Sequence, residues 1–182
     1  MSLIFLLKLQ KRLKGGLSMS KSTSGHFSGT KGNFVNKGVL TEAKNGSRNP
    51  VKEFEAKVSN VKSTMTSSGN ISASSIRENA GTFTNNSAYV YATALQDMGY
   101  NVSVKSSAKS RSGAQIITIS NSSKERNISQ VQVSPGGGRH GASPYVKIST
   151  TDNGKFKIVD GPESEYKSNA KETAEIIFRR KK

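Results

Sequence analysis

The sequence contains no cysteine and only two histidines, His26 and His140. Without cysteine there can be no disulfide bond and no thiolate metal site, because both require its sulfur. Two histidines also argue against a metal centre that needs several imidazoles, such as the site of a His-Asn-His endonuclease. The missing cysteine fits an extracellular route as well as a cytosolic one, so the compartment stays open.

Long hydrophobic runs are also missing, and hydrophobic residues make up only 32% of the chain. The apolar run at residues 3–7 is too short to span a bilayer, so we expect no stable membrane insertion. Basic residues follow this run, whereas a signal peptide places them before it. Residues 3–14 fit a short basic amphipathic helix on a membrane surface. An alternative is that translation begins at Met19.

Acidic residues are few, with 12 Asp and Glu against 28 Lys and Arg, which gives a formal net charge of +16. A charge of this size attracts polyanions, and nucleic acid is the commonest of them. Membrane surfaces and acidic proteins are the alternatives. Lys105, Lys109 and Arg111 form one basic cluster, and the tail that starts at Arg179 forms another. Each cluster fits either a contact to a nucleic-acid backbone or a solvated surface.

Residues 18–48 are rich in Ser, Gly, Lys, Thr and Asn and show no sustained periodicity, which predicts a flexible linker. We therefore divide the chain into a basic, flexible extension at residues 1–48 and one domain at residues 49–182. Asn49 and Pro50 are typical of a helix start, and apolar residues recur at helical spacing up to Lys62. Further helices are predicted over residues 72–79 and 85–98.

After Gly99 the pattern changes to short, often alternating apolar runs that are typical of strands. Six such runs occupy residues 100–105, 114–120, 128–133, 145–149, 155–159 and 173–179. Asn153-Gly154 predicts a hairpin between two of them. Helices followed by strands indicate an α+β fold, with the helices packed on one face of an antiparallel sheet of five or six strands. This layout resembles the barnase, EndoU, colicin and RelE group of ribonucleases, at the level of fold alone.

The stretch Ser134-Pro-Gly-Gly-Gly-Arg-His-Gly-Ala-Ser143 lies between two of these strands and carries the best candidate chemistry. An imidazole can give or take a proton near neutral pH, and a guanidinium can bind phosphate. These parts suit metal-independent cleavage of RNA, in which the 2′-hydroxyl is the nucleophile. A surface turn with an incidental histidine is the alternative. The predicted catalytic residues are His140, Arg139, Ser143 and Lys147, and the predicted substrate-binding residues are Lys105, Lys109, Arg111, Tyr145, Lys155 and Arg179.

A metal-dependent nuclease site is a second possibility. Asp152 followed by Glu165-Tyr-Lys167 has the residue types of an Asp…Glu-x-Lys core, in which carboxylates hold Mg²⁺ and lysine assists the attacking water. The surroundings of Glu165 indicate a loop, however, where such a core needs a strand. We therefore expect no cofactor and no metal, with Mg²⁺ on Asp152 and Glu165 of a deoxyribonuclease as the alternative.

A long phrase of the sequence resembles the C-terminal toxin module of bacterial polymorphic toxins, especially LXG-type toxins of Bacillus and relatives. It runs Val131-Gln-Val-Ser-Pro-Gly-Gly-Gly-Arg-His-Gly-Ala-Ser-Pro-Tyr-Val-Lys-Ile-Ser-Thr-Thr-Asp152 and continues through Gly154-Lys-Phe-Lys-Ile-Val-Asp-Gly161. The resemblance covers roughly residues 49–182. We expect no LXG secretion domain before Asn49.

The resemblance implies a growth-inhibiting nuclease that acts in interbacterial competition. Such a toxin is made in the cytoplasm, is secreted or delivered into a target cell, and is matched by a cognate immunity protein. An acidic immunity protein would complement the charge of +16. The main alternative to an enzyme is a basic module that binds nucleic acid without cutting it.

Overall fold

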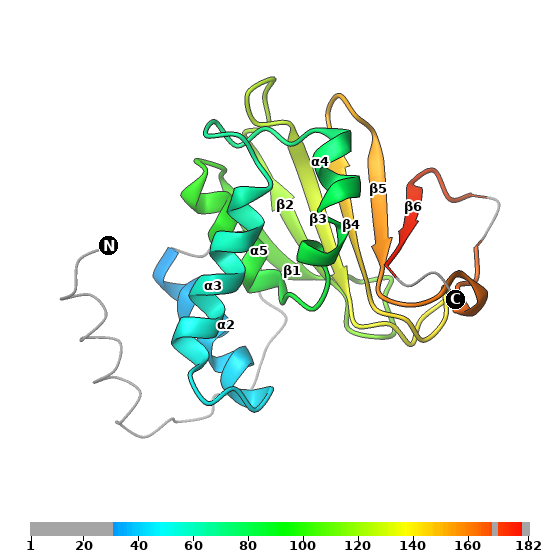
Figure 1. Cartoon of the computed structure of the whole chain (residues 1–182), viewed down its shortest axis with the longest axis horizontal. Coiled ribbons are helices and arrows are strands. Elements are labelled where there is room, and N and C mark those ends of the chain that lie inside the picture. The colour runs from blue at the N-terminus through cyan, green and yellow to red at the C-terminus, as the bar shows by residue number, and fades with distance from the viewer. Residues whose placement is uncertain (1–30, 169–170, 180–182) are drawn as a thin grey trace.

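The computed structural model describes residues 31–168 and 171–179, which form a group of helices beside a six-stranded sheet (Figure 1). The helices are α2 (Lys31–Lys44), α3 (Pro50–Ser63), α4 (Ala73–Glu78), the 3₁₀ turn η1 (Ala80–Phe83) and α5 (Ala88–Asp97). Helix α3 starts where the sequence predicts, because the Asn49 side chain accepts a hydrogen bond from the Lys52 N–H. The α+β fold predicted from the order of the elements is confirmed.

Helix α2 corrects the prediction of a linker up to residue 48. Phe34 and Val39 of this helix are each 2% exposed and belong to the core, and α2 packs against both α3 and α5. Close approach of α2 to α3 depends on Gly38, because a Cβ there would overlap the Phe54 ring. The folded domain therefore includes α2, and the boundary predicted at Asn49 is too late.

Helix α5 is the central helix and contacts α2, α3 and strands β1 to β3. Seven of its ten residues are buried, so apolar side chains surround it on nearly every side. It begins at Ala88, three residues later than predicted, because Thr84 and Ser87 are extended and Asn85 has a φ of 59°. The short predicted helix over residues 72–79 is present as α4, with Ser72 as its N-cap.

The sheet has the strand order β1-β2-β3-β4-β5-β6, and neighbours along the chain are neighbours in space. Its strands are β1 (Val102–Ser106), β2 (Gln115–Ile119), β3 (Ile128–Ser134), β4 (Tyr145–Thr150), β5 (Lys155–Val159) and β6 (Glu175–Phe178). The first five strands pair in antiparallel fashion, and Asn153-Gly154 lies in the β4–β5 hairpin as predicted. The β5–β6 pair is parallel, which the predicted antiparallel sheet did not include. The connection over residues 160–174, hereafter the crossover, makes this pairing possible.

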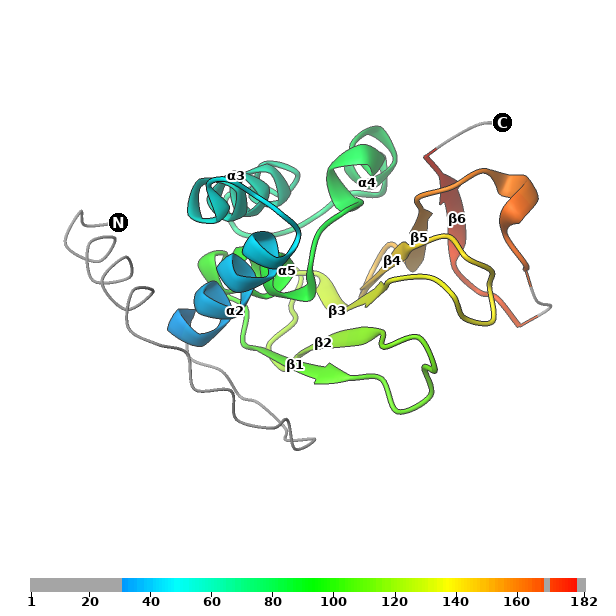
Figure 2. The same cartoon turned by 90° about the horizontal axis from the view of Figure 1, so that it is seen from below.

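The two faces of the sheet have different surroundings. One face carries the buried residues Val104, Ile117, Val131, Ile148 and Phe156 and packs under the helices. Side chains alternate along a strand, so the residues next to these in each strand point to the other side. That side, hereafter the open face, carries Lys105, Ile116, Gln132, Lys147 and Lys157. Figure 2 shows the helices on one side of the sheet and the crossover on the other.

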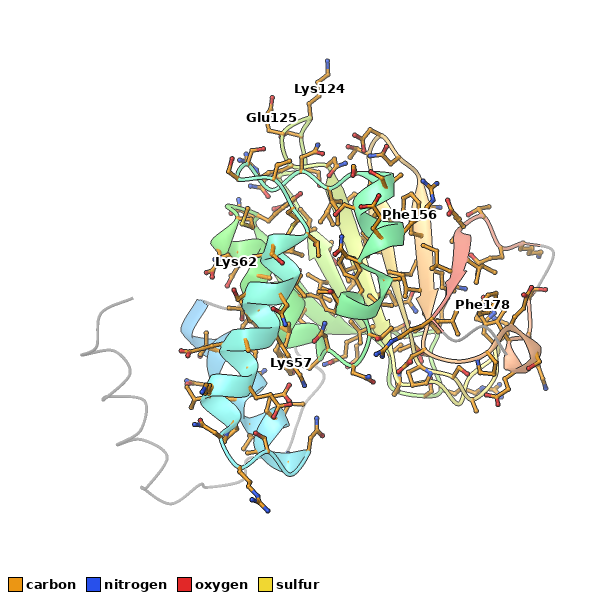
Figure 3. The ribbon with its side chains drawn as sticks, in the orientation of Figure 1. Lys57, Lys62, Lys124, Glu125, Phe156 and Phe178 are labelled. Atoms are coloured by element: carbon orange, nitrogen blue, oxygen red, sulfur yellow. The ribbon has the colours of Figure 1, made fainter. Side chains whose placement is uncertain are left out.

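Two phenylalanines illustrate this division. The Phe156 ring lies 5.7 Å from the Arg77 guanidinium of α4, on the helix side. The Phe178 ring instead meets the Tyr166 ring of the crossover, with ring centroids 5.6 Å apart. Figure 3 labels Phe156 close to α4 and Phe178 close to β6.

Among the described residues, no helix is long and apolar enough to cross a membrane. The predictions made for residues 1–30 lie outside the described residues. They concern the apolar run, the surface helix, the start at Met19 and residues 18–30 of the predicted linker.

Candidate active site on the open sheet face

Arg139 and His140 occupy the two central positions of a tight turn between β3 and β4. The Gly141 N–H donates to the Gly138 carbonyl at 3.2 Å, and the Gly137 N–H donates to the Gly141 carbonyl at 3.0 Å. Gly141 has a φ of +103°, which a residue with a side chain rarely adopts. The glycines on both sides of Arg139-His140 therefore serve to close the turn and to place two functional side chains at its tip.

The crossover fixes the orientation of the His140 imidazole. The Lys167 N–H donates to the His140 carbonyl at 3.0 Å, and His140 Nδ1 lies 2.9 Å from the Lys167 carbonyl oxygen. A carbonyl oxygen only accepts, so Nδ1 must carry the proton in this contact. In the neutral ring the second nitrogen, Nε2, is then an acceptor. This contact therefore selects the tautomer in which Nε2 can act as a base.

Two tyrosine rings enclose the imidazole. The Tyr166 ring is stacked on it, with centroids 5.3 Å apart and an interplanar angle of 4°. The Tyr145 ring meets it edge-on, with centroids 6.0 Å apart and an angle of 88°. The Tyr145 hydroxyl accepts a hydrogen bond from Gln132 at 3.3 Å, which links the ring to β3. His140 is therefore held by side chains from β4 and the crossover, although it lies at the tip of a loop.

A buried cluster lies next to these rings. Lys157 has a side chain only 3% exposed, forms an ion pair with Glu172 and donates to the Tyr166 hydroxyl at 2.8 Å. The Tyr166 hydroxyl in turn donates to Glu172 at 3.3 Å. Burial acts to raise the pKa of Glu172, but the hydrogen bond and charge of Lys157 outweigh it and lower that pKa. Burial and the charge of Glu172 raise the pKa of Tyr166, so this phenol stays protonated at neutral pH.

Lys147 and Arg139 are the cations of the site that remain available. Lys147 pairs with Lys157 across β4 and β5 and is half-buried on the open face. Burial lowers the pKa of Lys147, and the charges of Lys157, Lys155 and Arg139 lower it further. Within the described part of the chain, the side chains of Lys147 and Arg139 form neither a hydrogen bond nor an ion pair. An anion bound here would therefore relieve repulsion between cations instead of competing with an existing partner.

Ser143 does not join the predicted catalytic group. It is 8% exposed, and its hydroxyl donates to Glu165 at 3.5 Å where the 135–144 loop meets the crossover. A Cβ on Gly161 would overlap that hydroxyl. Ser143 therefore packs the two loops together.

The predicted substrate-binding residues divide into two groups. Tyr145 and Lys155 lie on the open face near Lys147, and Lys105 lies on the same face at β1, about 14 Å away across three strand spacings. Lys109 and Arg111 are exposed in the neighbouring β1–β2 loop, whose Ser112 comes close to Gly138. Arg179 is separate, because its guanidinium bonds Thr84 and Asp160 on the helix side.

The residues of the alternative Mg²⁺ site are not brought together. Asp152 lies in the β4–β5 hairpin, where it accepts hydrogen bonds from Asn127 and Asn153. Glu165 lies past the other end of β5, a strand of five residues that rise about 3.3 Å each. No group of three His, Asp or Glu side chains that could hold a metal ion occurs in the described ranges.

Sequence reasoning missed Lys157 and Glu172 as members of the site. It considered Tyr166 as an aromatic residue that could stack on bases, but it did not place this ring beside His140. The alternation of Lys155-Phe-Lys-Ile-Val159 does carry a signal, because it places Lys157 on the face opposite Phe156. No sequence pattern predicts that the crossover lies next to His140, because its approach depends on the parallel pairing of β6 with β5.

No protein-family model, no curated protein and no solved structure matches this chain. The case for a function therefore rests on the geometry of the site and on the charge of the chain.

Proposed function

We propose that this chain is a toxin domain that cleaves RNA without a metal, at the open face of its sheet. The observation that carries the proposal is the contact of His140 Nδ1 with the Lys167 carbonyl, which leaves Nε2 as an acceptor. Arg139 precedes His140 in the turn, and Lys147 lies two residues after Tyr145 on the open face, close enough to Arg139 for the two charges to interact. The side chains of both cations are without hydrogen-bond or ion-pair partners among the described residues. A proton acceptor next to an anion site is the arrangement that transfer of a phosphodiester to a neighbouring hydroxyl requires.

The proposed step uses the 2′-hydroxyl of the substrate. His140 Nε2 takes the proton of this hydroxyl while its oxygen attacks the adjacent phosphorus. The bond from phosphorus to the 5′-oxygen breaks, and that oxygen takes a proton from solvent water, which gives a 2′,3′-cyclic phosphate and a free 5′-hydroxyl. The hydroxide left by that water takes the proton from His140 Nε2 and restores the neutral ring. Arg139 and Lys147 stabilise the negative charge that builds up on the phosphoryl oxygens.

The open face supplies a surface on which a strand of RNA can lie. Lys105 and Lys155 are exposed on it, and Lys109 and Arg111 extend the positive surface into the adjacent loop. These cations would bind backbone phosphates and set the position of the strand without taking part in chemistry. The net charge of +16 supports the same substrate and favours an acidic immunity protein as partner.

The test is cleavage of single-stranded RNA by the full chain in excess EDTA. We expect cleavage by the unaltered chain and a loss of about 100-fold or more in His140→Ala, the range for removal of a general base. His26→Ala is the matched control, because it removes the only other histidine and should leave the rate unchanged.

Two outcomes would contradict the proposal. Cleavage that requires Mg²⁺ and survives His140→Ala would show that the chemistry depends on a metal and not on His140. RNA binding without cleavage would favour a non-catalytic nucleic-acid-binding module.

A further inference from the structure

Lys157 belongs to the buried cluster next to the His140 and tyrosine rings. Of the lysines in the ion pairs described for residues 31–168 and 171–179, it has the least exposed side chain. Its side chain is 3% exposed, and its partner Glu172 is 14% exposed. The ammonium also lies 5.0 Å from the Tyr145 ring centroid and 5.4 Å from that of Tyr166. Placing an ammonium group in such surroundings is costly unless it is paired, and a buried pair seldom stabilises a fold more than apolar residues of similar size would.

This cluster is joined to His140 by a continuous series of contacts. Lys157 and Glu172 both bond the Tyr166 hydroxyl and so fix this residue of the crossover. The Tyr166 ring stacks on the imidazole. The next residue, Lys167, then bonds His140 twice, through its N–H and through its carbonyl. The position of the Tyr166 hydroxyl therefore determines both the stacking and the hydrogen bond that selects the tautomer.

We infer that Lys157 and Glu172 are positioning residues, which act through Tyr166 and the Lys167 backbone to hold His140 in its Nδ1–H tautomer. The expected effect on catalysis rests on the proposed function, because a correctly oriented Nε2 is needed only if His140 acts as a base. Neither side chain touches the substrate in this scheme. Their removal should lower kcat and leave KM nearly unchanged, because substrate binding uses Arg139, Lys147 and the exposed cations.

The decisive variant is the double substitution Lys157→Met and Glu172→Leu, which removes both charges at once and leaves neither buried alone. We expect its Tm to equal or exceed that of the unaltered chain, because apolar replacement of a buried pair is commonly neutral or stabilising. We expect kcat to fall about 10- to 100-fold, the scale of a small misplacement of a catalytic group. The ¹⁵N spectrum of the His140 ring should change from one tautomer to a mixture.

The matched control is the exposed ion pair between Arg77 and Glu175, whose side chains are 52% and 43% exposed on the helix side. The double substitution Arg77→Gln and Glu175→Gln also removes one positive and one negative charge, and it should leave kcat and the His140 spectrum unchanged. Should the first double variant fail to fold, Tyr166→Phe provides the test. It keeps the stacked ring and removes the hydroxyl through which Lys157 and Glu172 act, so it should shift the tautomer in the same direction.

An unchanged His140 spectrum with an unchanged kcat in a folded variant would overturn the inference. So would a loss that appears only in KM. The spectrum is read without substrate, so it decides the positioning role even if the chain cleaves no RNA. If the unaltered chain cleaves no RNA but the double variant shifts the tautomer, the proposed ribonuclease activity is refuted and the positioning role stands. If the unaltered chain cleaves RNA but the double variant leaves the tautomer unshifted, the activity stands and the positioning role is refuted.

Discussion

His140 and its neighbours illustrate how far single residues can be interpreted from sequence. The glycine-rich stretch predicts a loop between two strands that carries Arg139 and His140, and in the structure these two residues occupy the tip of a tight turn in that loop. What orients the imidazole could not be predicted, because the Lys167 carbonyl is 27 residues away in sequence and reaches the ring only through the path of the crossover. For the same reason Ser143, plausible from its position in the loop, is in fact buried between two loops.

Lys147 should make the stability of the fold depend on pH. Burial and neighbouring cations lower the pKa of its side chain on folding from the ordinary value of 10.5. Between the lowered value and 10.5 the unfolded chain binds more protons, so the contribution of Lys147 to stability rises with pH in that window. At pH values below the lowered pKa, the side chain is charged in both states and destabilises the fold. Lys147→Met should therefore increase the free energy of unfolding at pH 7, and the increase should diminish as the pH approaches 10.5.

Urea unfolding at several pH values measures this change. Under the proposed function, the same variant should also cleave RNA more slowly, because it lacks the proposed contact of Lys147 with phosphate. Lys155→Met is the control, since this exposed neighbour on the open face should give little gain at any pH. A gain that does not depend on pH, or a loss of stability at pH 7, would contradict this interpretation of Lys147.

At the scale of elements, helix α2 shows why composition misled the prediction of a linker. Few of its residues are apolar, but Phe34, Val39 and the glycine at position 38 lie where α3 and α5 approach. Glu42 is 1% exposed yet satisfied by Lys57 at 2.7 Å, so a polar residue completes the buried side of the helix. A hydrophobicity pattern does not register a glycine contact or a paired carboxylate as core.

Gly38→Ala tests the packing of this helix. The added methyl group would overlap the Phe54 ring, and overpacking of this kind costs about 1–3 kcal/mol in the free energy of unfolding. Gly32→Ala in the first turn of the same helix meets nothing within 4 Å and should leave stability unchanged or raise it by less than the gain of about 0.5–1 kcal/mol in a helix interior. Chemical denaturation of both variants measures the contrast, and equal effects would show that α2 does not pack as described.

The crossover is the element that sequence reasoning least anticipated. Strand β6 occurs close to where its apolar run predicts. Its parallel pairing with β5 depends on a connection of fifteen residues whose anchors, Tyr166 and Glu172, meet Lys157 only in the folded sheet. Local patterns specify strands better than they specify which neighbour a strand joins and in which direction.

On the scale of the whole molecule, the two faces of the sheet differ in what covers them. The helices cover one face and supply the core, which the segregated order of helices and strands predicted. The other face carries lysines, tyrosines and the His140 turn over a rigid floor, as a site built partly from loops requires. Alternation within each strand predicts which residues share a face, but only the position of the helices determines which face stays open.

The most direct test of the central claim is cleavage by the full chain of an RNA oligonucleotide and of a DNA oligonucleotide of the same sequence, both in excess EDTA. If His140 activates the 2′-hydroxyl, the RNA is cut, its fragments carry 2′,3′-cyclic phosphate ends by mass spectrometry, and the DNA stays intact. Cleavage of both oligonucleotides, or RNA fragments with 5′-phosphate ends, would contradict the account.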